Sequence, residues 1–215
     1  MHFFLCMILI SLLAAAALAK APVSDGSFPD IQHERVDYWV AEFSKDPEYH
    51  KKIALGFERK PKYEKMIEEK LRDRGMPANL LYLAFEESAF NADACSRAKA
   101  IGIWQLTPAT ARLYGLKVNK KIDERKSVDK ETDAALRFLS HLHKHFGSWY
   151  LAAAAYNSGE HRISRVLKHR LGRDHDLHNR DYYKVWDDLP GETRDYVPAI
   201  IALKRISHDR AKYGF

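Results

Sequence analysis

Hydrophobic residues recur at helical spacing along most of the chain, and no alternating run is long enough to predict a useful strand. Between residues 31 and 74 the spacing predicts three highly charged helical segments. Their apolar positions are Val36, Trp39, Val40 and Phe43, then Tyr49, Ile53, Leu55 and Phe57, then Tyr63, Met66, Ile67 and Leu71. Apolar residues three and four positions apart share one side of a helix. The third segment is predicted to end at Gly75, a residue suited to the C-terminal end of a helix.

The second half of the chain repeats this periodicity between residues that start and stop helices. Thr107 followed by Pro108 resembles an N-cap with proline at the first helical position, and Gly115 ends the predicted helix. A longer amphipathic helix follows from Lys130 and is closed by Gly147. Further helices are predicted over residues 149–156, 161–171 and 192–210. We therefore predict an all-α protein whose helices are joined by short loops.

One short stretch, residues 80–90, places a carboxylate on an apolar helix side. Pro77 suits a first helical turn, so we expect a helix to begin near it. Glu87 projects from the middle of the apolar side, whereas Glu86 falls on the other side beside Tyr82. Poor hydration disfavours the charged form and raises the pKa of the Glu87 carboxyl, as a general acid requires. The alternative is a glutamate at the rim of the core, satisfied by an arginine or a tyrosine.

The N-terminus has the pattern of a secretory signal peptide. Residues 3–13 are almost entirely apolar, an alanine-rich run follows, and residues 17–19 have the small-x-small form of a cleavage site. We predict a signal peptide over residues 1–19 and a protein exported to the periplasm or cell envelope. An uncleaved membrane anchor is the alternative. Removal of the signal leaves Cys95 as the one cysteine, which we expect to be at least partly buried and which cannot form an internal disulfide.

The overall charge changes this picture little. The 215 residues suffice for one domain or a domain with an extension, and the formal net charge is +6. A basic surface permits an anionic partner such as wall polymer, nucleic acid or acidic lipid, without choosing among them. Since only the charge favours nucleic acid, we expect no nucleic-acid partner.

Four separated motifs occur in a distinctive order and at predicted helix ends. They are Glu87-Ser88, Gly102-Ile103-Trp104-Gln105, the run from Ala155 to Gly159, and the run from Glu192 to Val197. Together they resemble the soluble-lytic-transglycosylase domain, of lysozyme-like fold, in its membrane-bound lytic murein transglycosylase D branch. The resemblance is good over about residues 76–204 and weaker before them. Together with the signal peptide predicted over 1–19, it divides the chain into a helical extension over 20–75 and a catalytic domain over 76–215.

The resemblance also implies roles for individual residues. Glu87 matches the family's single catalytic acid, and Tyr196 matches the tyrosine that hydrogen-bonds it. The positions that match substrate-binding residues are Ser96, Gln105, Tyr156 and Asn157. Each of three residues also has a purely structural interpretation. Tyr156 is then a core aromatic, Asn157 a helix-ending residue and Ser96 a turn residue.

The chemistry implied by the resemblance is cleavage of the β-1,4 bond between N-acetylmuramic acid and N-acetylglucosamine in peptidoglycan. One glutamate acts first as acid and then as base, so that a 1,6-anhydromuramic acid end forms; most glycosidases use two carboxylates instead. The expected partner is the glycan strand, with no cofactor and no metal. Peripheral association with the membrane or wall and the oligomeric state stay open.

Three other functions agree with parts of the sequence. A goose-type lysozyme-like hydrolase shares the fold and the prominent acid, and a peptidoglycan-binding module would lack catalysis. A metalloprotein is suggested by His141, His143 and His145, of which the first and last share a helix face. The segment lacks the glutamate of a His-Glu-x-x-His motif, so a solvated helix face explains the histidines better.

Overall fold

The helices begin and end where local signals favour it. The computed structural model describes residues 28, 30–171 and 182–215, so the predicted signal peptide lies outside the described residues. The α-helices are α1 (Glu34–Lys45), α2 (Pro47–Arg59), α3 (Glu64–Asp73), α4 (Leu81–Ser88), α5 (Pro108–Leu113), α6 (Val128–Phe146), α7 (Trp149–Ser158), α8 (Glu160–Leu171) and α9 (Gly191–His208). Single 3-10 turns are Lys60–Lys62, Ala78–Leu80, Glu124–Lys126, Tyr182–Lys184, Trp186–Asp188 and Ala211–Tyr213. Across these residues, strand pairing is limited to isolated bridges, and the predicted all-α class is confirmed.

The predicted cap residues act as expected. The Thr107 hydroxyl accepts a hydrogen bond from the Thr110 N–H at the start of α5, and Pro108 is the first helical residue. Gly147 adopts a left-handed conformation, φ 65°, and ends α6. The helix expected near Pro77 is shorter than predicted: a 3-10 turn precedes α4, which ends at Ala89 with φ 49°. Its last turn therefore carries the two glutamates.

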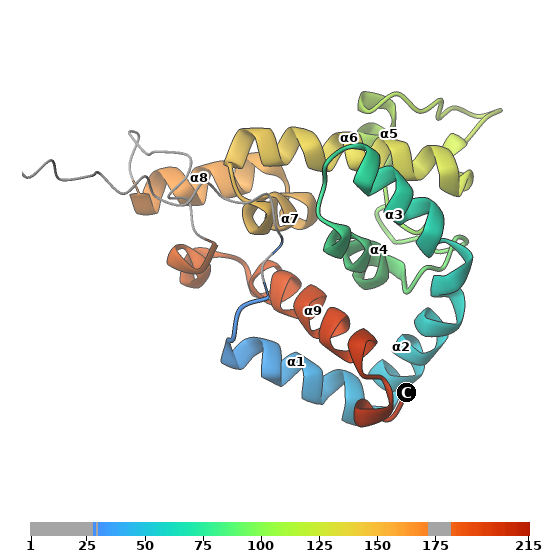
Figure 1. Cartoon of the computed structure of the whole chain (residues 1–215). Helices are drawn as coiled ribbons and strands as arrows, with labels where there is room; N and C mark the ends of the chain where they lie inside the picture. Colours follow the sequence, from blue (N-terminus) through green and yellow to red (C-terminus); the bar gives the residue numbers. More distant parts are fainter. Residues whose placement is uncertain (1–27, 29, 172–181) are drawn as a thin grey trace, which may run out of the picture.

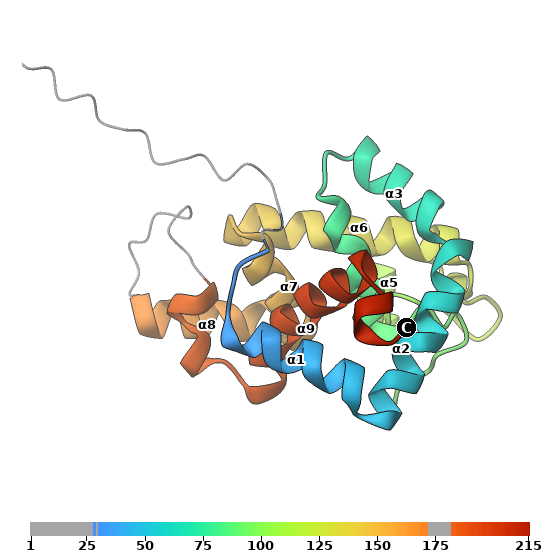
Figure 2. The same ribbon diagram turned by 60° about the horizontal axis from the view of Figure 1, so that its bottom comes forward.

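Helix α9 lies at the centre of the arrangement and packs against α1, α4 and α7, while α6 packs against α7 (Figure 1). With the bottom of the molecule turned forward, α1 lies in the foreground beside α9 (Figure 2). One continuous hydrophobic core includes Val36 and Ile53 from the predicted extension together with Leu83, Leu139 and Ile200. The helices before residue 76 thus share a core with those after it. The domain boundary at residues 75 and 76 stays a prediction.

No helix among the described residues combines the length and apolar character needed to cross a bilayer.

Gly56 allows α2 to approach the helix that carries the glutamates. A Cβ at this position would lie 2.0 Å from a ring carbon of Phe85, which is fully buried in α4. We expect Gly56→Ala to lower the free energy of unfolding by about 1–3 kcal/mol, because overpacking outweighs the gain in helix propensity. Urea denaturation measures the change.

Gly191→Ala is the matched control for this prediction. Gly191 is also helical, but a Cβ there would meet its nearest atom at 3.9 Å. Its replacement should leave the unfolding free energy unchanged or raise it slightly. Equal effects of the two substitutions would contradict the close contact of α2 and α4.

Candidate active site

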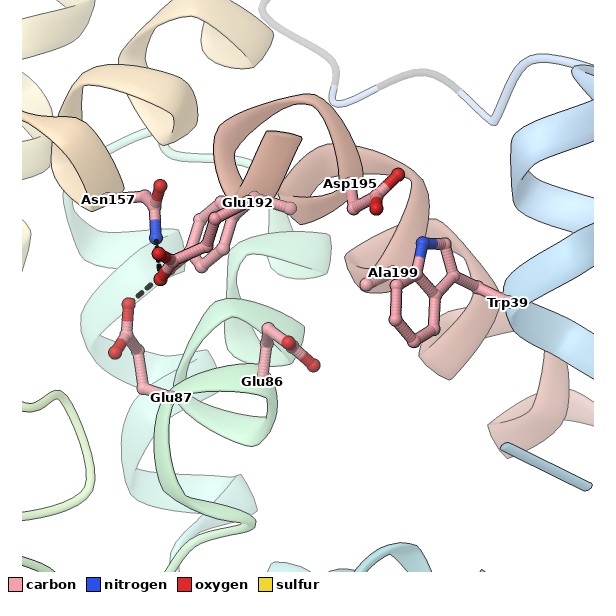
Figure 3. Close-up of a pocket in the computed structure, with 8 residues that line it drawn as sticks. Trp39, Glu86, Glu87, Asn157, Glu192, Asp195 and Ala199 are labelled. Carbon is pink, nitrogen blue, oxygen red and sulfur yellow. Dashed lines mark hydrogen bonds between the residues drawn. The ribbon is translucent and has the colours of Figure 1, made fainter. Parts of the chain in front are cut away.

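The last turn of α4 opens onto a cavity of about 360 Å³. Ala89 ends the helix, and its N–H bonds the Phe85 carbonyl at 2.7 Å. This abrupt end leaves the two glutamate side chains facing space between helices (Figure 3). The cavity is lined by Trp39, Glu86, Glu87, Asn157, Glu192, Asp195, Tyr196 and Ala199.

Glu87 meets a buried tyrosine from α9. The Tyr196 hydroxyl donates to Glu87 Oε1 at 2.5 Å. Burial raises the pKa of Glu87 to about 7, and the hydrogen bond from Tyr196 opposes part of that rise by favouring the carboxylate. A carboxyl group with this pKa is protonated in a large fraction of molecules at neutral pH, and its base form is equally accessible. Glu87 is therefore suited to give a proton and to take one back.

Glu86 points away from Glu87, as the helical pattern predicted. Its carboxyl group is directed toward the Trp39 side, yet both groups line the same cavity (Figure 3). Burial raises the pKa of Glu86 to about 7, against the opposing charge of Lys52. Tyr82, on the same side of α4 as Glu86, is itself buried.

Asn157 lies on the opposite side of the cavity, on α7. Its amide donates to Glu192 Oε1 at 3.4 Å, and its Oδ1 accepts from the Thr193 hydroxyl at 2.9 Å. Helix α7 continues through Ser158 and ends at Gly159. Asn157 thus does not end the helix, and contacts from α9 orient its side chain. Glu192 is in the first turn of α9, where the helix dipole favours a negative charge.

Tyr156 reaches the loop over residues 102–105 and is not among the residues that line the cavity. Its hydroxyl donates to the Trp104 carbonyl at 2.7 Å, and its ring packs against Phe138 with centroids 5.0 Å apart. The half-buried side chain supports the loop that lies next to Glu87 in the fold. In this structure its contacts are those of a packed aromatic with a satisfied hydroxyl.

Ser96 and Gln105 bond to the backbone of their own loop. Gln105 Nε2 donates to the carbonyls of Ala94 and Gly102, at 3.2 and 2.8 Å. The exposed Ser96 accepts from the Ala100 N–H at 3.1 Å, as a turn residue does. Neither lines the cavity. The adjacent Cys95 is exposed, so the expectation of burial was wrong; it lies on the outer side of this turn-rich segment.

Glu131 supports the same loop and was missed in the sequence. It is fully buried at the start of α6, and its two carboxyl oxygens accept from the N–H groups of Ile103 and Trp104, at 3.0 and 2.9 Å. Burial raises the pKa of Glu131 to about 8, and these two hydrogen bonds oppose the rise. Its spacing from Ala135 and Leu139, at four and eight residues, places it on the apolar helix face and could have identified it.

Two further hydrogen bonds connect the loop to the helices. The Ser88 hydroxyl, next to Glu87, donates to the Ile103 carbonyl at 3.0 Å. The Trp104 indole donates to the Thr132 hydroxyl at 2.9 Å. The loop is thereby held from α4, α6 and α7 together, which fixes its position beside Glu87.

The three histidines of α6 have ordinary structural contacts. His141 meets Glu160 at 3.0 Å, His145 meets the Ser164 hydroxyl at 3.3 Å, and His143 stacks on Trp149 with centroids 3.8 Å apart. In the part of the chain that the structure describes, no group of three or more histidine, cysteine, aspartate or glutamate side chains could hold a metal ion.

Comparison with known proteins decides the family. The transglycosylase SLT domain family matches residues 64–179, more than half of the chain. This chain belongs to the transglycosylase SLT domain family. Membrane-bound lytic murein transglycosylase D from two strains of Escherichia coli is 36% identical over 184 residues, which are 85% of this chain. The chain spans only 39% of the length of that relative.

A solved structure shares the SLT-domain fold. An inactive mutant of the lytic transglycosylase Slt from Pseudomonas aeruginosa superposes with a TM-score of 0.53 and 25% identity, covering 68% of this chain and 24% of the other. The lysozyme-like class predicted from the motifs is thus confirmed. The segment matched to the SLT family contains Glu87 and Asn157, whereas Tyr196 and Trp39 come from outside it.

Tyr196→Phe tests how this SLT-domain site tunes its acid. Loss of the hydroxyl removes a contact that favours the carboxylate, so the pKa of Glu87 should rise above about 7. Since a general acid acts in its protonated form, the high-pH limb of the rate profile should move to higher pH. The maximal rate should fall about tenfold because the carboxyl loses an orienting contact. Turbidity loss of cell-wall suspensions between pH 5 and 9 measures both effects.

Tyr213→Phe is the control, because Tyr213 lies in the last 3-10 turn and does not line the cavity. It should leave the profile unchanged. A high-pH limb that stays in place, or moves to lower pH, in Tyr196→Phe would contradict the assigned effect on Glu87.

Proposed function

We propose that the protein is a peptidoglycan lytic transglycosylase. It cleaves the β-1,4 bond between N-acetylmuramic acid and N-acetylglucosamine and leaves 1,6-anhydromuramic acid ends. The substrate is the glycan strand, as the names of the murein transglycosylases among its relatives suggest. The observation that carries the proposal is the half-buried Glu87 carboxyl, hydrogen-bonded by Tyr196 and facing a cavity large enough for part of a sugar chain.

In the first step Glu87 acts as the acid. Its proton passes to the glycosidic oxygen, the bond from that oxygen to C1 of the muramic acid breaks, and the N-acetylglucosamine hydroxyl leaves. The acetamido oxygen of the muramic acid stabilises the positive charge that develops at C1. Glu87 is now a carboxylate, and the Tyr196 hydroxyl favours this form.

In the second step Glu87 acts as the base. The carboxylate takes the proton of the muramic C6 hydroxyl, whose oxygen attacks C1 and closes the anhydro ring. The acid is thereby regenerated, and no water is consumed. Asn157 contributes to the wall that faces the sugar, oriented by Glu192 and Thr193. Ser96, Gln105 and Tyr156 keep the substrate-binding roles that the family resemblance implies, beside the cavity. Gln105 and Tyr156 bond the carbonyls of Gly102 and Trp104, and Ser96 bonds the Ala100 N–H.

The products of digestion test this reaction. Purified peptidoglycan is digested with the protein, and the released muropeptides are analysed by mass spectrometry. The expected ends are 1,6-anhydromuramic acid. Products one water heavier, with reducing ends, would instead identify a goose-type lysozyme-like hydrolase that uses the same acid. Co-sedimentation with the wall without cleavage would identify a binding module.

We further propose export to the periplasm or cell envelope, with residues 1–19 as the signal peptide, 20–75 as a helical extension and 76–215 as the catalytic domain. The apolar N-terminal run supports export, and the Escherichia coli relative is named as a membrane-bound protein. Peripheral association of the protein with the membrane or the cell wall agrees with the apolar N-terminal run and with the name of this relative. Fractionation of cells that express the full chain tests the location: recovery in the cytosol would refute it.

A further inference from the structure

Two polar groups in the cavity have nothing to bond to. Glu86 Oε2 and Trp39 Nε1 are buried atoms without a hydrogen-bond partner among the described residues. Both side chains line the cavity that contains Glu87. Figure 3 shows them at the same end, with the Glu86 carboxyl directed away from Glu87 and the indole of Trp39 approaching beside Ala199. Buried donors and acceptors are rarely left unpaired in folded proteins, so this end of the cavity is suited to a polar ligand.

The Trp39 side of the cavity is firmly held. The indole packs against Phe43 and Tyr49, with ring centroids 5.2 and 5.7 Å apart. One turn earlier on α1, Arg35 forms two hydrogen bonds to Asp195, at 2.5 and 2.7 Å, and Asp195 also lines the cavity. A second ion pair joins Arg205 of α9 to Asp37 of α1 at 3.0 Å. Helix α1 is therefore a fixed wall of the cavity, although it precedes the segment matched to the SLT family.

An aromatic side chain beside a neutral carboxyl group suits an N-acetylated sugar. The C–H faces of a pyranose ring pack on the surface of an indole, and its hydroxyl and acetamido groups both donate and accept hydrogen bonds. A protonated carboxyl likewise offers one donor and free acceptor positions, while the indole N–H is a donor. Burial raises the pKa of Glu86 to about 7, so that the neutral form is well populated at neutral pH.

We propose that Trp39 and Glu86 bind the sugar residue next to the sugar whose glycosidic bond is cleaved at Glu87. This inference rests on the proposed function. It assigns part of the glycan-binding site to α1, which lies in the predicted extension. Trp39 supplies the apolar face and the indole N–H, and Glu86 binds a hydroxyl or acetamido group at the sugar's edge.

Binding is measured in the Glu87→Gln protein, so that no turnover occurs. The probe is a tetrasaccharide of alternating N-acetylglucosamine and N-acetylmuramic acid, titrated by calorimetry. Adding Trp39→Ala or Glu86→Leu should weaken binding about tenfold or more, and Trp39→Phe should weaken it less because an aromatic face remains. Glu86→Gln retains a hydrogen-bond donor and an acceptor, so its affinity for the tetrasaccharide should stay within about threefold of that of the Glu87→Gln parent. Glu58→Leu is the matched control: Glu58 is an exposed residue of α2 that does not line the cavity.

The same substitutions in the protein with Glu87 intact separate binding from chemistry. They should raise KM more than they lower kcat, with no change in the kind of product. Thermal unfolding verifies that each variant folds; if Trp39→Ala does not, Trp39→Phe and Glu86→Leu decide the result.

Three outcomes would overturn the assignment. The first is unchanged affinity in folded Trp39→Phe and Glu86→Leu proteins. The second is no binding of the tetrasaccharide by the Glu87→Gln parent. The third is a Glu86→Leu substitution, with Glu87 intact, that lowers kcat rather than raising KM and changes the products. That result would give Glu86 a chemical role. Failure of the proposed function is distinct, because it appears as the absence of anhydro ends in the digest by the unaltered protein.

Discussion

Glu87→Gln should lower the rate of peptidoglycan cleavage about 10³-fold. The amide has nearly the shape of the carboxyl group but can neither give the proton to the leaving oxygen nor take one from the C6 hydroxyl, and general acid–base groups contribute about 10²–10⁴ to enzymatic rates. Tyr196 would still find an oxygen acceptor at this position, so the cavity should keep its shape. Release of anhydromuropeptides, quantified by chromatography and mass spectrometry, measures the loss.

Stability distinguishes this loss of chemistry from a loss of folding. Burial opposes the charged form of Glu87, so a neutral amide should leave the melting temperature at pH 8 unchanged or higher. Glu58→Gln, an exposed carboxyl group of α2 outside the cavity, should keep full activity. Activity within a few-fold of the unaltered protein in Glu87→Gln would remove this residue from the proposed mechanism.

Gly102→Ala should lower the free energy of unfolding by about 3–5 kcal/mol. Most of the enzymatic activity should be lost as well. Gly102 has φ 90°, where a side chain is strained by about 1–2 kcal/mol. The larger cost comes from contact: a Cβ would lie 2.3–2.4 Å from the carboxyl atoms of Glu131. That carboxyl would have to move, and the buried N–H groups of Ile103 and Trp104 would lose their acceptors.

A second glycine separates the contact from the backbone strain. Gly159 has φ 93°, yet a Cβ there would find no atom within 4 Å. Gly159→Ala should therefore lower the unfolding free energy by only about 1–2 kcal/mol. Chemical denaturation of both proteins measures the difference. Equal costs at the two glycines would mean that Glu131 does not hold the loop in the way described.

The sequence by itself determined the class of fold and the positions of most helices. Helical periodicity, N-caps and C-terminal glycines act within a few residues of the chain, so Thr107 and Gly147 mark real helix ends. Glu87 was identifiable for the same reason, because its place on an apolar helix face depends only on neighbouring residues. Its partner Tyr196 followed from the motifs, which resemble those of a family whose fold the chain shares.

Only the tertiary structure decided which side chains share the cavity. Glu86 points away from Glu87, as the helical pattern predicted, but α4 is short and packed on several sides, so both glutamates line the same cavity. Trp39 comes from a helix 48 residues before Glu87, and no local pattern places it there. Glu131 bonds the backbone of a loop 27 and 28 residues away. A cavity is the space left between packed elements that are distant in sequence. Periodicity along one helix indicates which residues face inward, but it does not indicate which residues of other helices they contact.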